Sequence, residues 1–548
     1  MKGLLASLPS AGELPGWADV VPFIPALVLV LGGSLLVLLE VSTRTERRGY
    51  MPWLTAATAV LAGLFVIRPI DGPLLLFGGA AVLDDFAVFI SVVVCASLAL
   101  SALVSSDYLR GLCIERGEYY GLLCFAAAGM LMLAVSSDLI TLFVSLALMS
   151  VSTYALIAFR RGSDRSVEAA YKYLVLSGFS AAIFLYGASL LFTATGELGF
   201  AAIAQHAAAP TPLFLVGSGL VTVGFAFKLA AVPFHLWAPD VYEGAPTPVV
   251  AFLAAGVKAA VFAALVRLLL MALGDPAVAR SGIGWGHLIF AFCLLSMVVG
   301  NVMALLQDNV KRMLGFSWIA HAGYVFLGVT AAAWGRPEVI DSVAIYLLAY
   351  GISAVGAFAV VGAVEHRRRL EGEDASGHID ELAGLSKRSP AMAFAMAVFM
   401  LSLAGIPPTV GFFAKLEVLR VVFAAAQADP GMAIWLYGLV VMGIVTSVIG
   451  LYYYLRVIVA MYMREEQGKD TAAAEPEKAG AGVSSASPRA VYSSALRLGV
   501  AAAALAVILL GALPGPLSSW AKGAVRASFG EDVQVSSAQL LSSGQPEE

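Results

Sequence analysis

Charged residues are scarce in this chain. Lys, Arg, Asp and Glu make up 13% of its 548 residues, about half of the roughly 25% that is usual in a soluble domain. The formal net charge of -4 is spread along the whole length without a dense basic stripe, so the sequence lacks the electrostatic footprint of a nucleic-acid-binding protein. Hydrophobic residues make up 60%, which is typical of a polytopic membrane protein whose partner is the lipid bilayer.

The residues that hold redox groups are also few. The four cysteines, Cys95, Cys113, Cys124 and Cys293, have no C-x-x-C spacing, and the six histidines are scattered. Cluster and zinc sites usually need such spacing, and no Gly-rich phosphate loop follows a strand pattern. We therefore expect no nucleotide, metal, cluster or haem in this chain, and any redox chemistry is expected in partner proteins.

Long apolar stretches predict an all-α fold, because about 20 apolar residues cross the ~30 Å of hydrocarbon as a helix. About fourteen transmembrane helices are expected, of which the seventh and the twelfth are broken. They are placed at about 20–40, 51–68, 85–105, 119–135, 138–159, 171–194, 212–244, 249–273, 285–306, 314–334, 341–364, 391–425, 433–463 and 495–514.

Basic residues predict the orientation. The loops that follow odd-numbered helices carry most of the lysines and arginines, including the run Arg367–Arg369. Because basic loops stay in the cytoplasm, both termini are expected on the non-cytoplasmic side, and this run is interpreted as an anchor of that kind. The predicted regions are a three-helix part (1–118), two five-helix units (119–273 and 285–463), a disordered cytoplasmic loop (464–494), a last transmembrane helix (495–520) and a polar tail (521–548).

Two breaks interrupt the apolar pattern. Lys228 lies near the centre of the seventh segment, shortly before Pro233, and Lys415 follows the run Gly405–Gly411 in the twelfth. The breaks are five helices apart, so helices 4–8 and 9–13 would enter the membrane from opposite sides. This predicts two inverted repeats with discontinuous helices at mid-membrane depth. A single proline kink is equally compatible with plain packing, whereas two matched kinks with lysines favour a function.

Four ionisable residues inside predicted helices are the main candidates for a proton path. Lys228, Lys258 and Lys415 are costly to place in hydrocarbon, and we interpret them as groups that exchange protons near neutral pH. The alternative is a lysine permanently paired as a structural bridge. His321, in the tenth helix, is a candidate for passing protons between the two halves, and an ordinary core histidine is nearly as compatible.

Other charges are weaker candidates. Glu168 and Lys172 form an i, i+4 pair at the start of the sixth helix, which is compatible with a surface pair or with a proton path. Asp240 and Glu243 follow the first break and are placed in an aqueous vestibule. Snorkelling toward the interface is the expected behaviour of Arg267 and Arg456, which are near helix ends.

At these residues the chain resembles the antiporter-like membrane subunits of respiratory complex I, and most closely the N type. The similarity lies in the first break, Phe227 to Pro246, which has His235-Leu236-Trp237 where the related L and M types have His-Thr-Trp. It extends to Ser166–Tyr173, Met303–Tyr324 and Gly405–Lys415, and covers most of the chain from the first helix to the fourteenth.

The resemblance implies a proton channel with lysines in helices 7, 8 and 12, which correspond to Lys228, Lys258 and Lys415. It further implies M- and K-type neighbouring subunits, a bacterial inner membrane, and NADH, FMN, iron–sulfur clusters and quinone in partner subunits. Two alternatives stay open: a subunit of a multi-subunit cation/proton antiporter, and a structural membrane-arm subunit with impaired pumping. Oxidoreductases with electron donors other than NADH carry similar subunits.

One position departs from the family pattern. The family has a glutamate in helix 5 as the ion-pair partner of the helix 7 lysine, and this chain has Ala147 there. Without that anion, weakened or altered proton coupling is expected. Three replacements are possible: Asp138, Glu168, or an acid from a neighbouring subunit.

Overall fold

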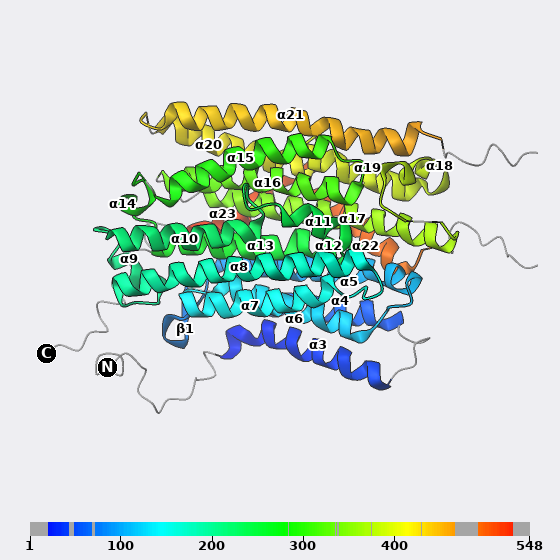
Figure 1. Ribbon diagram of the computed structural model, residues 1–548, viewed down its shortest axis with the longest axis horizontal. Coiled ribbons are helices and arrows are strands. Elements are labelled where there is room, and N and C mark those ends of the chain that lie inside the picture. Colours follow the sequence, from blue (N-terminus) through cyan, green and yellow to red (C-terminus); the bar gives the residue numbers. More distant parts are fainter. Residues whose placement is uncertain are drawn as a thin grey trace, which may run out of the picture.

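The computed structural model describes residues 20–42, 49–67, 72–282, 284–334, 336, 339–373, 375–428, 430–465 and 492–529. Its long helices run side by side in one bundle (Figure 1). The first half contains η1 (Val21–Phe23), α3 (Ile24–Ser42), α4 (Met51–Val66), β1 (Leu74–Leu76), η3 (Phe77–Gly79), β2 (Ala81–Leu83), α5 (Asp85–Gly111), α6 (Gly117–Val135), α7 (Leu139–Ile157), α8 (Asp164–Thr195), α9 (Phe200–Gln205), α10 (Pro212–Leu229), α11 (Trp237–Gly244), α12 (Thr247–Phe252), η4 (Leu253–Val257), α13 (Lys258–Arg267) and η5 (Leu268–Ala272).

The second half continues the bundle. It contains α14 (Pro276–Ala279), α15 (Trp285–Leu305), α16 (Val310–Ala333), α17 (Ile340–Leu370), η7 (Ile379–Leu382), α18 (Leu385–Arg388), α19 (Pro390–Ala404), α20 (Val410–Ala428), α21 (Ala433–Met463), α22 (Ser494–Ala512) and α23 (Pro514–Phe529). Helices dominate the described residues, and the two strands form a short antiparallel hairpin that pairs Leu75 with Val82.

Twelve helices of the described residues are long and apolar enough to cross a membrane. Two shorter apolar helices, α4 and α19, occupy the second predicted segment and the first part of the twelfth. Every one of the fourteen predicted segments therefore contains a helix, and the expectation of a helical, multi-span membrane protein is confirmed. The continuous helix from Thr247 to Ala272 and helix α16 are buried along their length and form the centre of the bundle.

Both predicted breaks are present. Helix α10 ends at Leu229, where Ala230 takes a left-handed conformation with φ 58°, and α11 begins only at Trp237. Helix α19 ends at Ala404, Gly405 has φ 84°, and α20 begins at Val410. A left-handed residue is a common helix terminator, and in each break it leaves helix-end carbonyls that need other partners.

Two expectations need revision at helix ends. Helix α17 continues to Leu370, so the run Arg367–Arg369 lies on a helix and its arginines pair with acids such as Glu371 and Glu365. Helix α23 continues to Phe529, so residues 521–529 belong to a helix that packs on α5 and not to a polar tail. The predicted loop 464–494 lies almost entirely outside the described residues, as do both chain ends.

Candidate functional site

Lys228 lies at the end of α10, where its buried ammonium faces α7 and α8. Its Nζ donates to Ser150 Oγ of α7 at 2.8 Å and to Ser177 Oγ of α8. Tyr154 donates its hydroxyl to the same Ser177 Oγ at 2.6 Å. Among the described residues these hydroxyls, and no carboxylate, are the hydrogen-bond partners of the Lys228 ammonium.

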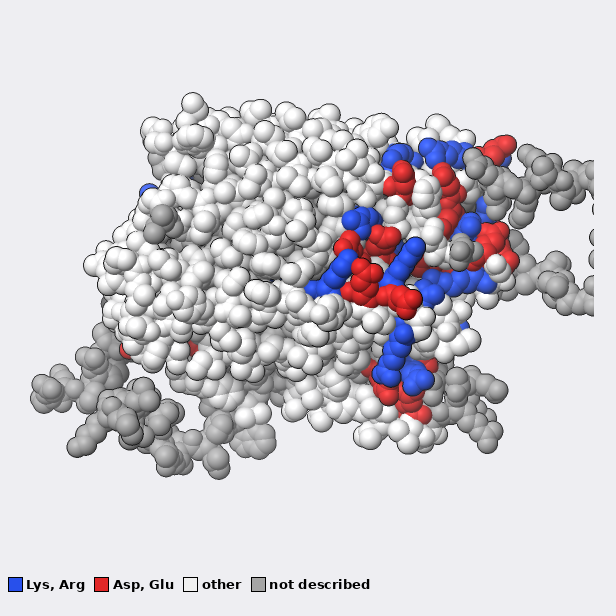
Figure 2. All heavy atoms as spheres, viewed as in Figure 1, with Lys and Arg blue, Asp and Glu red and all other residues white. Residues whose placement is uncertain are grey.

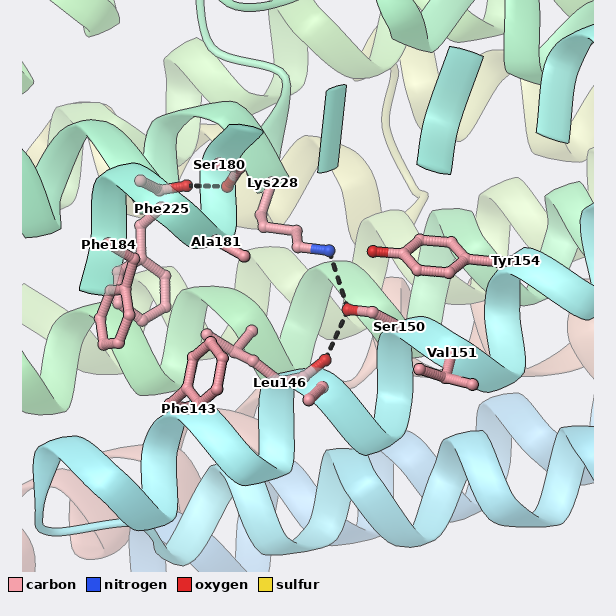
Figure 3. A pocket seen from close by; sticks show the side chains of 12 residues that line it. Phe143, Leu146, Ser150, Val151, Tyr154, Ser180, Ala181, Phe184, Phe225 and Lys228 are labelled. Atoms are coloured by element: carbon pink, nitrogen blue, oxygen red, sulfur yellow. Dashed lines mark hydrogen bonds between the residues drawn. The ribbon is translucent and has the colours of Figure 1, made fainter. Parts of the chain in front are cut away.

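A cavity of about 120 Å³ adjoins this lysine. Figure 3 shows Lys228 reaching toward Ser150, with the rings of Phe143, Phe184 and Tyr154 around the space. Its lining is mainly apolar, and Ala147, in the position that the family gives to a glutamate, forms part of its wall. The small side chain at this position thus leaves room beside a buried cation.

The broken end of α10 is held by three side-chain donors. Trp237 Nε1 donates to the carbonyl of Phe227 at 2.9 Å, Lys258 Nζ to that of Lys228 at 3.2 Å, and Trp318 Nε1 to that of Leu229 at 2.9 Å. Three consecutive carbonyls at the helix end gain side-chain donors in this way, and that of Phe227 also accepts the N–H of Ala230 at 3.1 Å. The helix end also carries partial negative charge, which favours a cation beside it.

Lys258 is enclosed between two indole rings. Its Nζ lies 4.8 Å from the ring centre of Trp237 and 5.0 Å from that of Trp318, within the range of cation–π attraction. The π-helical turn Leu253–Val257 directly precedes it, and such turns often occur at functional positions. Lys258 therefore links the first break to helix α16, which carries Trp318.

His321 lies on the same helix as Trp318, one turn further along. Its Nδ1 is 2.7 Å from the Tyr346 hydroxyl and its Nε2 is 2.9 Å from the Tyr454 hydroxyl. The ring of Tyr350 packs on Trp318 at 5.0 Å and on His321 at 4.7 Å between ring centres. Both ring nitrogens thus have a partner that can donate or accept a proton.

Lys415 lies on the far side of His321, against the second break. Its Nζ donates to the carbonyls of Leu403 and Ala404 at 2.9 Å each and to Ser447 Oγ at 3.2 Å. These carbonyls end helix α19, so the lysine caps a broken helix as Lys258 does. A cavity of about 10 Å³ lies between His321 and Lys415, which is about the space of one water molecule.

The structure thus places four predicted residues in one buried row. We call Lys228, Lys258, His321 and Lys415, together with the aromatic residues between them, the central row. It runs from the outer helices α7 and α8 through the buried centre of the bundle to α20.

The weaker candidates lie outside this row. Asp138 caps α7: its carboxylate accepts from the backbone N–H groups of Ile140 and Thr141 at 2.6 and 2.7 Å. Glu168 pairs with Lys172 at 2.7 Å. Neither acid is bonded to Lys228.

Lys172 belongs to a partly exposed charge network at the first break. It pairs with Asp240 at 2.7 Å, and Arg312 pairs with Asp240 at 2.6 Å and with Glu243 at 3.1 Å. Figure 2 shows charges of both signs gathered at one end of the face in view, while the rest of that face is almost uncharged. The network includes both acids that we expected in a vestibule.

Comparisons with known proteins agree with this arrangement. Residues 136–450 match the family described as NADH:quinone oxidoreductase/Mrp antiporter, transmembrane. The chain is 43% identical to NADH-quinone oxidoreductase subunit N of Myxococcus xanthus over 92% of this chain and 96% of that protein. It is 45% identical to NADH-quinone oxidoreductase subunit N 1 of Sorangium cellulosum over 80% and 88%.

The chain belongs to the subunit N family of NADH-quinone oxidoreductases. A chain of respiratory complex I from Thermus thermophilus has a similar structure, with a TM-score of 0.69 and 31% identity over 90% of this chain and 98% of that one. A chain of the Mrp complex from Dietzia has a TM-score of 0.77 at 23% identity, over 96% of this chain and 99% of that one, and shares the fold.

For a member of the subunit N family, the most consequential residues that the sequence reasoning missed are aromatic. Trp318, Tyr346, Tyr350 and Tyr454 connect the charged members of the row. Trp318 precedes His321 by three residues, Tyr350 follows Tyr346 by four, and Tyr454 belongs to the run Tyr452–Tyr454. Such aromatic residues are common in apolar helices, and only the three-dimensional contacts single these out.

The expectation for Arg267 is wrong. Its side chain is 0% exposed and does not reach an interface. Its guanidinium instead forms two hydrogen bonds of 2.8 Å with Asp84, the residue that caps α5. A buried arginine needs a paired carboxylate, and the apolar sequence around Arg267 gave no sign that a residue so far away supplies it. Arg456 bonds to Gln307 and Asp308 at a helix end, with a partly exposed side chain.

Proposed function

We propose that this chain is a membrane-arm subunit of a proton-translocating NADH:quinone oxidoreductase and that it conducts protons through the central row. The reaction at the quinone takes place elsewhere in the complex and drives the transport. The observation that carries this proposal is the row itself, in which buried lysines and a histidine follow one another across both helix breaks, joined by a hydrogen bond, by aromatic contacts and by a small cavity.

The broken helices offer a way to couple protons to movement. Lys258 and Lys415 each donate to carbonyls at the end of a discontinuous helix. These carbonyls accept hydrogen bonds and carry partial negative charge, so they stabilise the protonated lysine more than the neutral one. A shift of a helix end away from its lysine lowers the lysine's affinity for the proton. By linkage, protonation in turn favours the closed contact.

Hydroxyl groups surround two of the ionisable residues. Ser150, Ser177 and Tyr154 lie around Lys228, and Tyr346 and Tyr454 flank His321. A hydroxyl can accept one proton while it donates another, so these groups can take a proton from the residue that they contact and return it. Lys172, Asp240, Arg312 and Glu243 supply a polar, partly exposed region beside the first break, and we assign the contact with water to it.

The assembly follows from the same proposal. The chain lies in a bacterial inner membrane with both termini on the non-cytoplasmic side and has M- and K-type subunits as neighbours. NADH, FMN, iron–sulfur clusters and quinone are bound by partner subunits, and this chain supplies the proton path. Similarity to relatives named subunit N supports this assignment, and the two matched breaks support a pair of inverted repeats, helices 4–8 and 9–13.

Proton transport by the intact complex in sealed vesicles tests the role of the row. Lys258→Met removes the charged link between the two halves while it keeps a long side chain. We expect proton uptake per NADH oxidised to fall strongly. Lys387→Met is the matched control, because Lys387 is exposed and pairs only with the exposed Glu465 among the described residues. Equal uptake in both variants would mean that the row does not conduct protons.

One observation favours a second candidate, a structural subunit with impaired pumping. Lys228 has a cavity where the family has an acid. For such a subunit, Lys258→Met leaves the ratio of protons to NADH at the wild-type value while assembly of the complex is unchanged. Assembly measured by native gel electrophoresis of the same membranes separates this outcome from a folding defect.

A further inference from the structure

We infer that a neighbouring membrane subunit inserts an aspartate or glutamate side chain into the cavity beside Lys228 and supplies the carboxylate that this chain lacks. The inference rests on the proposed function, because it assumes assembly with other membrane subunits. It assigns to the α7–α8 face a partner of defined chemistry, namely a transmembrane helix with an acid at mid-membrane depth.

The first support is an unneutralised charge. Lys228 is buried, and its ammonium has serine hydroxyls as hydrogen-bond partners and two tyrosine rings beside it among the described residues, none of which is an anion. A charged lysine in an apolar interior is costly unless an anion pairs with it. Arg267, another deeply buried cation of the first half, has such an anion in Asp84, at 2.8 Å. Lys258, which is also buried, bonds to a helix-end carbonyl between two indole rings. Of these three cations, Lys228 is the one that borders a cavity large enough for a further side chain.

The second support is the position of the cavity. Its wall includes Ala147 and Val151 of α7 and Ala181 of α8. Val151 is 64% exposed, and the two alanines are half-buried, so the cavity lies directly under the outer surface. Lys228 lies at its inner wall (Figure 3). A side chain that comes from outside between α7 and α8 meets this ammonium.

Internal replacements are already engaged. The Asp138 carboxylate accepts bonds from the backbone of Ile140 and Thr141 and from the Thr141 hydroxyl at 2.6 Å. Glu168 is 63% exposed and pairs with Lys172. Of the three replacements for the family glutamate, the structure leaves an acid from outside the chain.

A protein helix suits this site better than a lipid acid. Ser150 and Ser177, the partners of Lys228, lie inside α7 and α8, and Ser177 is five residues, about 7.5 Å along the helix axis, from Lys172 of the charge network. A lipid carboxylate stays at headgroup depth, whereas a transmembrane helix can fix an acid at mid-depth when a cation receives it. The outer face here is apolar and exposed, with Val144 at 58% and Phe179 at 63%, as a helix-packing face requires.

Cross-linking with a membrane-permeable carbodiimide tests the inference in the intact complex. The buried carboxyl group adds to the carbodiimide to give an O-acylisourea. The neutral Lys228 amine attacks its acyl carbon, so an amide bond forms while the acyl–oxygen bond to the reagent breaks and the reagent leaves as its urea. Mass spectrometry of the digested complex is expected to show Lys228 joined to an aspartate or glutamate of another membrane subunit. Lys228→Met should lose this product.

Two variants show whether the reagent reaches the cavity. Ala147→Glu and Ala181→Glu place a carboxylate in the cavity wall from α7 and α8, and each should give a link to Lys228 within the chain at the expense of the link between subunits. If either control gives its internal link and the wild type gives none, the inference is wrong. A fatty acyl group on Lys228 would also contradict it, because the acid would then come from lipid.

Transport provides a readout that does not depend on the reagent. If an outside acid already pairs with Lys228, the second acid of Ala147→Glu competes with it, so proton uptake per NADH falls below that of Ala147→Gln. If proton uptake per NADH in Ala147→Glu rises above that of the wild type, the site lacked an acid and the inference is wrong. Loss of transport in Lys228→Met without any cross-link leaves the proposed function intact and removes the inference. A cross-link in the wild type together with normal transport in Lys228→Met would support the outside acid and would contradict the proposed proton path.

Discussion

The two broken helices hold their lysines in different ways. Lys228 bonds to serine hydroxyls on neighbouring helices and borders a cavity of about 120 Å³ at the outer surface. Lys415 bonds to the carbonyls of its own broken helix, and the cavity beside it, of about 10 Å³, lies among buried side chains. Neither lysine bonds to a carboxylate among the described residues. Helix-end carbonyls with partial negative charge surround Lys415, whereas Lys228 has neutral hydroxyls and open space for the outside acid that we infer. A repeated break thus fixes where a lysine lies but not what neutralises it.

Loss of either lysine is expected to have the largest effect. Lys228→Met and Lys415→Met each interrupt the central row, so we expect both to remove most of the proton uptake per NADH despite their different surroundings. Vesicle transport measurements check this. If only one of the two variants loses transport, the two halves do not form a single proton path, because such a path needs both lysines.

Trp318 gives the next largest effect. Trp318→Phe keeps an aromatic ring beside Lys258 but removes the N–H that bonds to the carbonyl of Leu229. A buried carbonyl without its partner costs about 1–3 kcal/mol. We expect a lower melting temperature and slower transport, with the loss confined to the first break. Trp334→Phe, at the end of α16 near His287, serves as a matched control and should leave transport unchanged.

Removal of a serine partner of either lysine is expected to have a smaller effect on transport. Ser177→Ala removes a hydroxyl that bonds to both Lys228 and Tyr154, and we expect a partial loss of transport that corresponds to about 1 kcal/mol. Ser447→Ala removes one of three partners of Lys415 and leaves two carbonyls in place, so its effect should be smaller. A larger loss of transport in Ser447→Ala than in Ser177→Ala would show that the hydroxyl partner is not more important for Lys228 than for Lys415.

The smallest effect is expected outside the row. Lys172→Met removes one cation from a network in which Arg312 still pairs with Asp240 and Glu243. Exposed ion pairs contribute little, about 0–1 kcal/mol, and added salt screens them further. Transport should fall only slightly, and the difference from wild type should shrink at high ionic strength. A loss as large as that of Lys228→Met would place Lys172 in the path.

Much of the helical framework could be predicted from the sequence, because hydropathy and proline placement are local signals. The breaks at Pro233 and Gly405 and the lysines beside them follow from the same patterns. Interactions between distant segments could not be predicted in this way. Asp84 is 183 positions from Arg267, and Trp318 is 89 positions from the carbonyl of Leu229 that it binds. The hydropathy pattern of a helix does not indicate which distant residues its side chains contact.

The boundaries of helices at the membrane surface also escaped prediction. Helix α8 begins at Asp164 and α17 ends at Leu370, well into sequence that is polar enough to be assigned to loops. Charged residues continue these helices outside the apolar core because i, i+4 pairs such as Arg367–Glu371 support them. Hydropathy measures the apolar part of a helix and misses such extensions.

The most direct test of a proton path through the central row is a transport measurement on vesicles that contain the Lys228→Met complex. The quantity measured is the number of protons taken up per NADH oxidised. Lys228 begins the row, lies on the broken helix and borders the open cavity, so every step of the proposed path depends on it. If protons pass through Lys228, this ratio is well below that of the wild type and of Lys387→Met, with the complex fully assembled. A ratio equal to that of the wild type would contradict the proposed path.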